Sequence, residues 1–166
     1  PFHAGIFGYD EGVIYIPADV PHEAYVPGGT LTDTIRHEFG HAWHWLDREF
    51  FERGWFERAF GSDYEDSSPS PFIAWEEEYE DNQQASMEYS RLRTDQSRAK
   101  FDNKHLLLEF VSGYAATRPC EDFAETFMFY LRNRNSLHVF KNRPGVYRKI
   151  KAVECAVKIA KKELGL

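Results

Sequence analysis

Residues 37–41 read His-Glu-Phe-Gly-His, and this stretch predicts both the central helix of the chain and a metal site. On a helix, His37 and His41 are about one turn apart, so both imidazoles lie on one face and can ligate one ion. Glu38 lies beside them, offset enough not to ligate but near enough to act as a general base toward a water molecule. The pattern H-E-x-x-H therefore predicts a zinc site with Glu38 as its base.

The sequence around this motif is patterned as a long amphipathic helix. Thr30 or Thr32 can cap its N-terminus, and Asp33 in the first turn is favourable to the helix dipole. We expect the helix to extend from about residue 32 to about residue 52. Apolar residues recur at three- and four-residue steps and predict its buried face: Ile35, Phe39, Ala42, Trp43 and Leu46.

The flanking segments predict an α+β fold that is mostly helical. Residues 5–17, GIFGYDEGVIYIP, favour a small N-terminal β-hairpin that turns at Asp10-Glu11-Gly12. C-terminal helices are expected from about Cys120 to Arg132 and from about Val146 to Leu164, where Pro144 suits the helix start. The last helix is expected to bury four apolar residues, Ile150, Val153, Val157 and Ile159.

Length and composition favour a single domain. The chain has 166 residues, including 14 Phe, 9 Tyr and 4 Trp that can fill a core. We interpret residues 1–166 as one domain cut from a longer precursor, because the N-terminus Pro-Phe-His lacks Met and a signal-peptide layout. The two cysteines, Cys120 and Cys155, leave both a single bridge and two free thiols open.

The formal net charge of −7 is unevenly distributed along the chain. Residues 61–90 hold nine Asp or Glu residues and no Lys or Arg, and the rest of the chain has 18 acids against 20 bases. We interpret about 61–100 as an acidic insertion over the core, beginning with an exposed polar loop at 61–71. No basic field predicts nucleic-acid binding, and no apolar run reaches the roughly 18 residues of a membrane span.

Catalytic zinc takes three protein ligands, so a further ligand is needed beside the two histidines. Asp47 is one candidate, because HEFGHAWHWLD at 37–47 resembles the extended metzincin motif in the variant that ends in Asp. That motif has Gly where this chain has His44, and without Gly the residue at 47 stays on the helix, about 9 Å of rise beyond His41. His44 lies near the ligand face, but we expect it at the helix surface or the core edge.

Glu121 is the other candidate for the third ligand. Glu121 and Glu125 share one face of the expected helix. One carboxylate can bind the metal while the carboxylate of the next turn accepts a hydrogen bond from a ligand imidazole. This arrangement predicts Glu121 as the ligand and Glu125 as its supporting acceptor.

Three features of the chain resemble one family of peptidases: HEFGHA at 37–42, Tyr114 seven residues before the Glu that opens EDFAETF at 121–127, and the turn Asn142–Pro144 before the last helix. They resemble the C-terminal protease domain of anthrax lethal factor and the bacterial Pro-Pro endopeptidases, which are gluzincins related to thermolysin. The resemblance covers the active-site helix and roughly residues 110–160. It implies a zincin-like fold, Glu121 as third zinc ligand, and Tyr114 as the hydroxyl that stabilises the tetrahedral intermediate.

The sequence therefore predicts a zinc-dependent endopeptidase acting on peptide or protein substrates, in which Glu38 takes a proton from water and returns it to the leaving amine. Residues Ile14 to Pro17 are the best candidate for the edge along which a substrate lies as an added strand. The alternative is a zincin-like module that binds a partner or regulates without turnover. The localisation stays open, with a secreted or delivered toxin or effector as one hypothesis.

Overall fold

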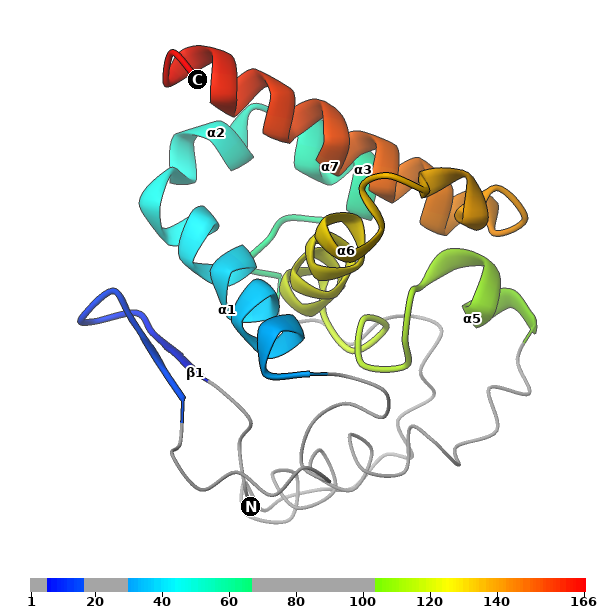
Figure 1. The fold of residues 1–166 in the computed structure, drawn as a ribbon, viewed down its shortest axis with the longest axis horizontal. Helices are drawn as coiled ribbons and strands as arrows, with labels where there is room; N and C mark the ends of the chain where they lie inside the picture. The colour runs from blue at the N-terminus through cyan, green and yellow to red at the C-terminus, as the bar shows by residue number, and fades with distance from the viewer. Residues whose placement is uncertain (1–5, 17–29, 67–103) are drawn as a thin grey trace.

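The computed structural model describes residues 6–16, 30–66 and 104–166 (Figure 1). Most of the expected acidic insertion, at about 61–100, lies outside the described residues. Within them, helices α1, α6 and α7 form the body of the molecule, and a short hairpin lies beside α1 (Figure 1). The prediction of a mostly helical α+β fold is confirmed.

Helix α1, Leu31–Leu46, carries the HEFGH motif and begins at a complete capping box. The Thr30 hydroxyl accepts a hydrogen bond from the backbone N–H of Asp33 at 3.2 Å, and the Asp33 carboxylate accepts one from the backbone N–H of Thr30 at 3.2 Å. Both donors are backbone groups that a helix N-terminus leaves without partners inside the helix. The structure thus selects Thr30 over Thr32 as the cap.

The prediction that this helix continues to residue 52 is wrong. Helix α1 ends at Leu46, Asp47 adopts non-helical angles with φ −143° and ψ 59°, and a separate helix α2 follows at Arg48–Glu52. The change of direction turns Phe50 and Phe51 into the core, where both are buried. Burial of these two aromatic side chains stabilises the break after α1.

The predicted buried face of α1 is wrong at three of its five residues. Ala42 is buried as predicted, but Ile35, Phe39 and Leu46 are 41%, 51% and 67% exposed, and the residues buried on this helix are mainly polar and include the motif histidines. Trp43 is half-buried. Phe39, Trp43 and Leu46 line an open apolar groove of about 490 Å³ shared with helices α6 and α7. The helix therefore turns the polar side chains of its motif, rather than its largest apolar side chains, toward the interior.

Helices α6, Pro119–Asn133, and α7, Pro144–Glu163, agree closely with the two expected C-terminal helices, and each begins at a proline. Short helices α3, Trp55–Phe60, and α5, Lys104–Glu109, and the 3₁₀ turn Leu137–Phe140 complete the described helices.

The described core has two clusters. The first is largely aromatic and is built around Phe123 of α6, which is fully buried. The second packs the first turns of α7 against the segment after α5, with Val146 and Ile150 fully buried. Of the apolar positions predicted on α7, Ile150 and Val153 are buried, whereas Ile159 is 43% exposed.

One buried ion pair joins α6 to α7. The ammonium of Lys149 lies 2.6 Å from the Asp122 carboxylate, 2.9 Å from the carbonyl oxygen of Glu109, and 3.9 Å from the centre of the Phe110 ring. Burial raises the pKa of the Asp122 carboxyl to about 7, against the opposing effect of the Lys149 ammonium. Lys149 is therefore buried in this ion pair, whereas Lys151 and Lys158 of the same helix are exposed.

The N-terminal hairpin is confirmed. Strands β1, Ile6–Gly8, and β2, Val13–Tyr15, pair antiparallel with Phe7 opposite Ile14. Gly12 in the turn has φ 65°, the left-handed conformation that glycine adopts without steric cost. Both strands contact α1, so the hairpin lies against the helix that carries the motif. Of the expected substrate edge, Pro17 lies outside the described residues.

Cys120 and Cys155 are both free thiols, which decides between the two alternatives left by the sequence. Within the described ranges, none of the helices has the length and the apolar character that crossing a membrane requires.

Candidate metal centre and active site

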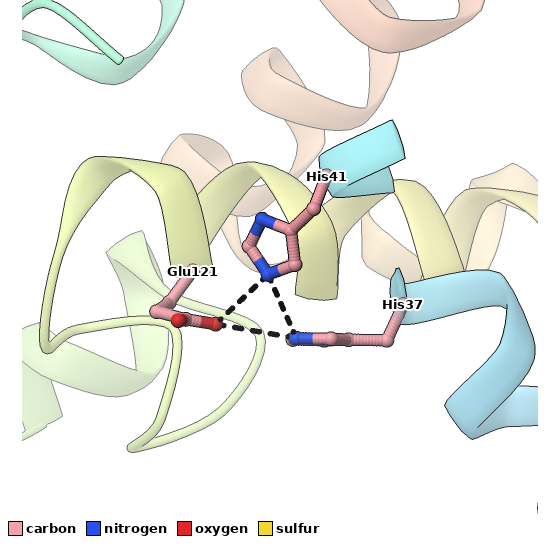
Figure 2. Close-up of side chains that lie close together, drawn as sticks. All are labelled: His37, His41 and Glu121. Atoms are coloured by element: carbon pink, nitrogen blue, oxygen red, sulfur yellow. Dashed lines mark hydrogen bonds and ion pairs between the residues drawn. The ribbon is translucent and has the colours of Figure 1, made fainter. Parts of the chain in front are cut away.

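Three side chains from α1 and α6 bring lone-pair atoms to one point (Figure 2). The Nε2 atoms of His37 and His41 are 3.2 Å apart, and Oε2 of Glu121 lies 3.2 Å from the first and 3.4 Å from the second. Zinc bonds of about 2.0–2.1 Å in tetrahedral geometry separate neighbouring ligand atoms by roughly 3.3–3.4 Å. The three separations therefore have the dimensions of three corners of a zinc tetrahedron.

The electrostatics of this group also fit a cation. Oε2 of Glu121 is buried and has no hydrogen-bond partner of normal geometry among the described atoms, although two imidazole nitrogens face it. Burial acts to lower the pKa of His37, but the carboxylates of Glu121 and Glu125 outweigh it and raise that pKa to about 10. Burial acts to raise the pKa of Glu121, and the two histidines outweigh it and hold that pKa well below its usual range. The site thus stabilises positive charge between these groups, as a metal-binding pocket must.

A close approach of α1 to α6 makes this convergence possible. A Cβ atom added to Gly40 would lie 3.0 Å from the Cα atom of Ala124, which is backbone and cannot turn aside. Gly40 stands one residue before His41, and Ala124 lies one helical turn after Glu121. Glycine in the middle of HEFGH therefore lets the two helices pack closely enough for the two imidazoles and the Glu121 carboxylate to meet.

Glu125 lies where the sequence predicted an acceptor for a ligand imidazole. Its Oε1 atom is 2.8 Å from Nδ1 of His37, and its Oε2 atom accepts a hydrogen bond of 2.8 Å from the Ser112 hydroxyl. The Ser112 oxygen accepts in turn from the backbone N–H of Ala115 at 3.0 Å. With Nδ1 of His37 as the donor, Nε2 carries the lone pair that faces the centre. Ser112 had no motif or periodicity in the sequence that singled it out.

Tyr64 supplies the corresponding contact to His41, and sequence reasoning missed it. Its hydroxyl is 2.7 Å from Nδ1 of His41 in a buried hydrogen bond. The expectation of an exposed loop at 61–71 is wrong at this residue, because Tyr64 is only 4% exposed. Burial raises the pKa of the Tyr64 hydroxyl well above its usual range, so the phenol stays neutral. A lone tyrosine in a Ser- and Pro-rich stretch carries no periodic signal that could have identified it.

His44 is buried at the edge of this site. It is 5% exposed, and its ring stacks on the Tyr64 ring with centroids 3.7 Å apart and planes 10° apart. Its Nδ1 atom has no hydrogen-bond partner among the described residues. Burial, followed by the nearby Arg48 charge, lowers the pKa of His44 to about 4, so the ring is neutral. The core-edge position expected for His44 is confirmed.

Glu38 and Tyr114, the two residues with predicted catalytic roles, are both buried. Glu38 follows His37 on α1, and the ring of Tyr114 lies 5.6 Å from the ring of His37, centroid to centroid. Tyr114 belongs to the turn segment between α5 and α6. The fold therefore brings Tyr114 against His37, which is 77 positions earlier in the chain.

Asp47 does not join the group. It follows the last residue of α1 and contributes to the apolar groove beside Leu46. Among the described residues, the one set that could hold a metal ion is His37, His41 and Glu121.

Comparison with known proteins gives one match. The model of a family described as "Putative zinc-binding metallo-peptidase" matches residues 22–156. This range includes His37, His41 and Glu121, the three residues of the metal group. No curated protein and no solved structure matches the chain. The family description, with the His-His-Glu group, confirms zinc as the cofactor predicted from HEFGH.

Proposed function

Because the chain belongs to this family of zinc-binding metallopeptidases, we propose that it is an endopeptidase in which His37, His41 and Glu121 hold the zinc ion. The observation that carries the proposal is the set of three ligand-atom separations, 3.2, 3.2 and 3.4 Å. They are close to the roughly 3.3–3.4 Å expected between neighbouring ligand atoms of tetrahedral zinc. Three protein ligands leave the fourth position open, which is the arrangement of catalytic rather than structural zinc.

Bound zinc would supply Lewis acidity toward water and toward the substrate carbonyl. In this proposal the Glu38 carboxylate takes a proton from the attacking water and later gives it to the leaving amine. The Tyr114 hydroxyl donates a hydrogen bond to the oxygen of the carbonyl as negative charge develops there. Burial of both side chains supports these roles, because a low dielectric strengthens charge-assisted hydrogen bonds.

Glu121 places the site in the gluzincin class in this proposal. Its carboxylate faces both histidines from α6, whereas Asp47 lies beyond the end of α1. The likeness to the lethal factor protease domain and the Pro-Pro endopeptidases stays a prediction, as do the single domain over 1–166 and the substrate edge at 14–17. Peptides or proteins are the substrates that a peptidase of this class would take.

The alternative is a zincin-like module that binds a partner without turnover. Such a module would need neither a base beside the ligands nor a phenol against one of them. The presence of Glu38 and Tyr114 at those places favours the enzyme.

The test combines zinc content with cleavage of a peptide library. The wild-type protein is expected to hold one zinc ion by elemental analysis and to cleave internal peptide bonds. Glu38→Gln should keep the zinc and lose cleavage by at least about 100-fold, because it removes a general base. Glu49→Gln, an exposed acid on α2, is the matched control and should retain full activity.

Each contrary result has a distinct meaning. A wild-type protein without zinc would refute the metal site. Zinc without cleavage would favour the binding module, and unchanged cleavage by Glu38→Gln would remove Glu38 from the chemistry.

A further inference from the structure

We propose that Tyr64 is a positioning residue that orients His41 toward the metal, and that His44 is the platform that holds Tyr64 in place. The inference rests on the proposed function only in that His41 is taken as a zinc ligand. It gives a role to Tyr64 and His44, which take no part in the proposed catalytic mechanism.

The hydrogen bond between Tyr64 and His41 determines which nitrogen of His41 faces the centre. Nε2 of His41 points at Nε2 of His37 and at Oε2 of Glu121, so it must carry the lone pair that would bind the ion. Nδ1 must then carry the proton and donate a hydrogen bond to the Tyr64 oxygen, 2.7 Å away. A ligand histidine whose far nitrogen is held in this way keeps both its tautomer and its ring orientation.

The two ligand histidines receive this support from different chemical groups. His37 donates to the Glu125 carboxylate, which is an anion, whereas His41 donates to a neutral phenol. A phenol fixes the ring without adding a negative charge. Since Glu121 already contributes a carboxylate to the centre, a neutral partner for His41 keeps a further charge out of this buried region.

Aromatic packing fixes the Tyr64 ring from several sides. The His44 ring stacks on one face at 3.7 Å, with the two planes only 10° apart. Phe51 and Phe56 contact Tyr64 at centroid distances of 5.7 and 5.4 Å. A ring held this tightly has little freedom to move its hydroxyl away from His41. His44 thus acts through its flat face rather than through its nitrogens.

The Tyr64 hydroxyl also has a neighbour on the hairpin side. Tyr9, in the turn after β1, is close enough to Tyr64 for each phenol to influence the pKa of the other. The hydroxyl of Tyr64 has His41 as its partner at 2.7 Å, so this buried polar group is satisfied.

The test is the zinc affinity of Tyr64→Phe, measured by competition with a chromogenic chelator. We expect a loss of about 10- to 100-fold, the usual effect of removing a partner of a ligand histidine. Tyr130→Phe, which removes a hydroxyl from a partly buried tyrosine of α6 away from the metal group, is the matched control and should bind zinc like the wild type.

A second readout separates positioning from a general structural effect. In the zinc-loaded wild type, the Nδ1 proton of His41 should be visible by NMR as a slowly exchanging signal. In Tyr64→Phe it should exchange faster, while the far-UV circular dichroism of the metal-free protein is unchanged. His44→Ala should weaken zinc binding by a smaller factor, and His44→Phe, which keeps an aromatic plane, should restore it.

Four outcomes would overturn the inference. The first is that Tyr64→Phe binds zinc as tightly as the wild type with an unchanged His41 signal, and the second is that Tyr130→Phe loses as much affinity as Tyr64→Phe. If Tyr64→Phe does not fold, the test moves to His44→Ala. A zinc affinity of His44→Ala equal to that of the wild type would then overturn the inference. A wild-type protein that binds no zinc overturns the proposed function as well, whereas normal wild-type binding confines the failure to Tyr64.

Discussion

Nδ1 of His37 lies 2.8 Å from Oε1 of Glu125, and the two residues are 88 positions apart in the chain. The carboxylate is itself held by the Ser112 hydroxyl, which accepts from the backbone N–H of Ala115. Hydrogen bonds therefore connect the backbone N–H of Ala115, through Ser112 and Glu125, to the imidazole of His37.

Glu125→Gln should lower zinc affinity by about 10- to 100-fold, since the neutral amide makes the His37 imidazole a weaker ligand. Competition with a chelator measures the change. Glu49→Gln, on the exposed surface of α2, serves as control and should bind zinc normally. Equal affinities of Glu125→Gln and wild type would show that this hydrogen bond contributes nothing to metal binding.

Tyr114→Phe should lower kcat by about 100- to 1,000-fold with little change in zinc affinity, because it removes one hydrogen bond to the developing oxyanion. Steady-state kinetics on a cleaved peptide and the same chelator competition measure the two effects. The pattern should be the reverse of that for Tyr64→Phe, which acts on the metal. A fall in zinc affinity equal to the fall in kcat would contradict the role of Tyr114.

Gly40→Ala should destabilise the protein by roughly 1–3 kcal/mol and lower zinc affinity, since the added methyl group meets the α6 backbone and separates the two helices. Its Cβ atom would stand 3.0 Å from the Cα atom of Ala124. The gain in helix propensity from Gly to Ala, about 1 kcal/mol, opposes the clash and does not outweigh it. Urea unfolding and chelator competition check both parts; a more stable variant with normal zinc affinity would refute the close approach.

Lys149→Met should destabilise the protein by about 3–5 kcal/mol, because it leaves the Asp122 carboxylate buried without its cation. The two groups are 2.6 Å apart and almost fully buried. Lys151→Met, an exposed lysine on the same helix, is the control and should change the free energy of unfolding by less than about 0.5 kcal/mol. Pairing Lys149→Met with Asp122→Leu should recover most of the loss; no recovery would mean that the ion pair itself, rather than an unpaired charge, sets the cost.

Acid should destabilise the metal-free protein partly through His44. Burial, followed by Arg48, lowers the folded-state pKa of His44 to about 4 from an ordinary value of 6.5. Between these values the unfolded chain binds the proton and the folded chain does not, so this stability is present above pH 6.5 and is lost as the pH falls toward 4. Between pH 6.5 and 4, the free energy of unfolding of His44→Phe should fall by roughly 1–3 kcal/mol less than that of the wild type. Parallel pH profiles of the free energy of unfolding would show that His44 does not titrate in this way.

Local patterns determined much of this protein. HEFGH on a capped helix indicated His37 and His41 as ligands, and the four-residue step from Glu121 to Glu125 indicated the two carboxylates that now face the histidines from α6. Helix periodicity locates residues of one element relative to each other, so these spacings could be read without a structure. The α6 and α7 boundaries were likewise readable, because proline starts both helices.

Helix periodicity did not predict which face of α1 is buried, because contacts with other helices determine that face. The apolar positions of α1 indicated Ile35, Phe39 and Leu46 as buried, yet these three are exposed. The helix instead turns its histidines inward, where Glu121 and Glu125 of α6 face them.

The sequence by itself determined which residue types gather at the candidate metal centre and which helices carry them. Only the tertiary structure decided that Tyr64 and Ser112 complete the support of the two histidines, since each reaches the site across a long separation in sequence. Such contacts depend on how α1, α6 and the intervening segments pack, and hydrogen bonds between distant residues leave no period in the chain.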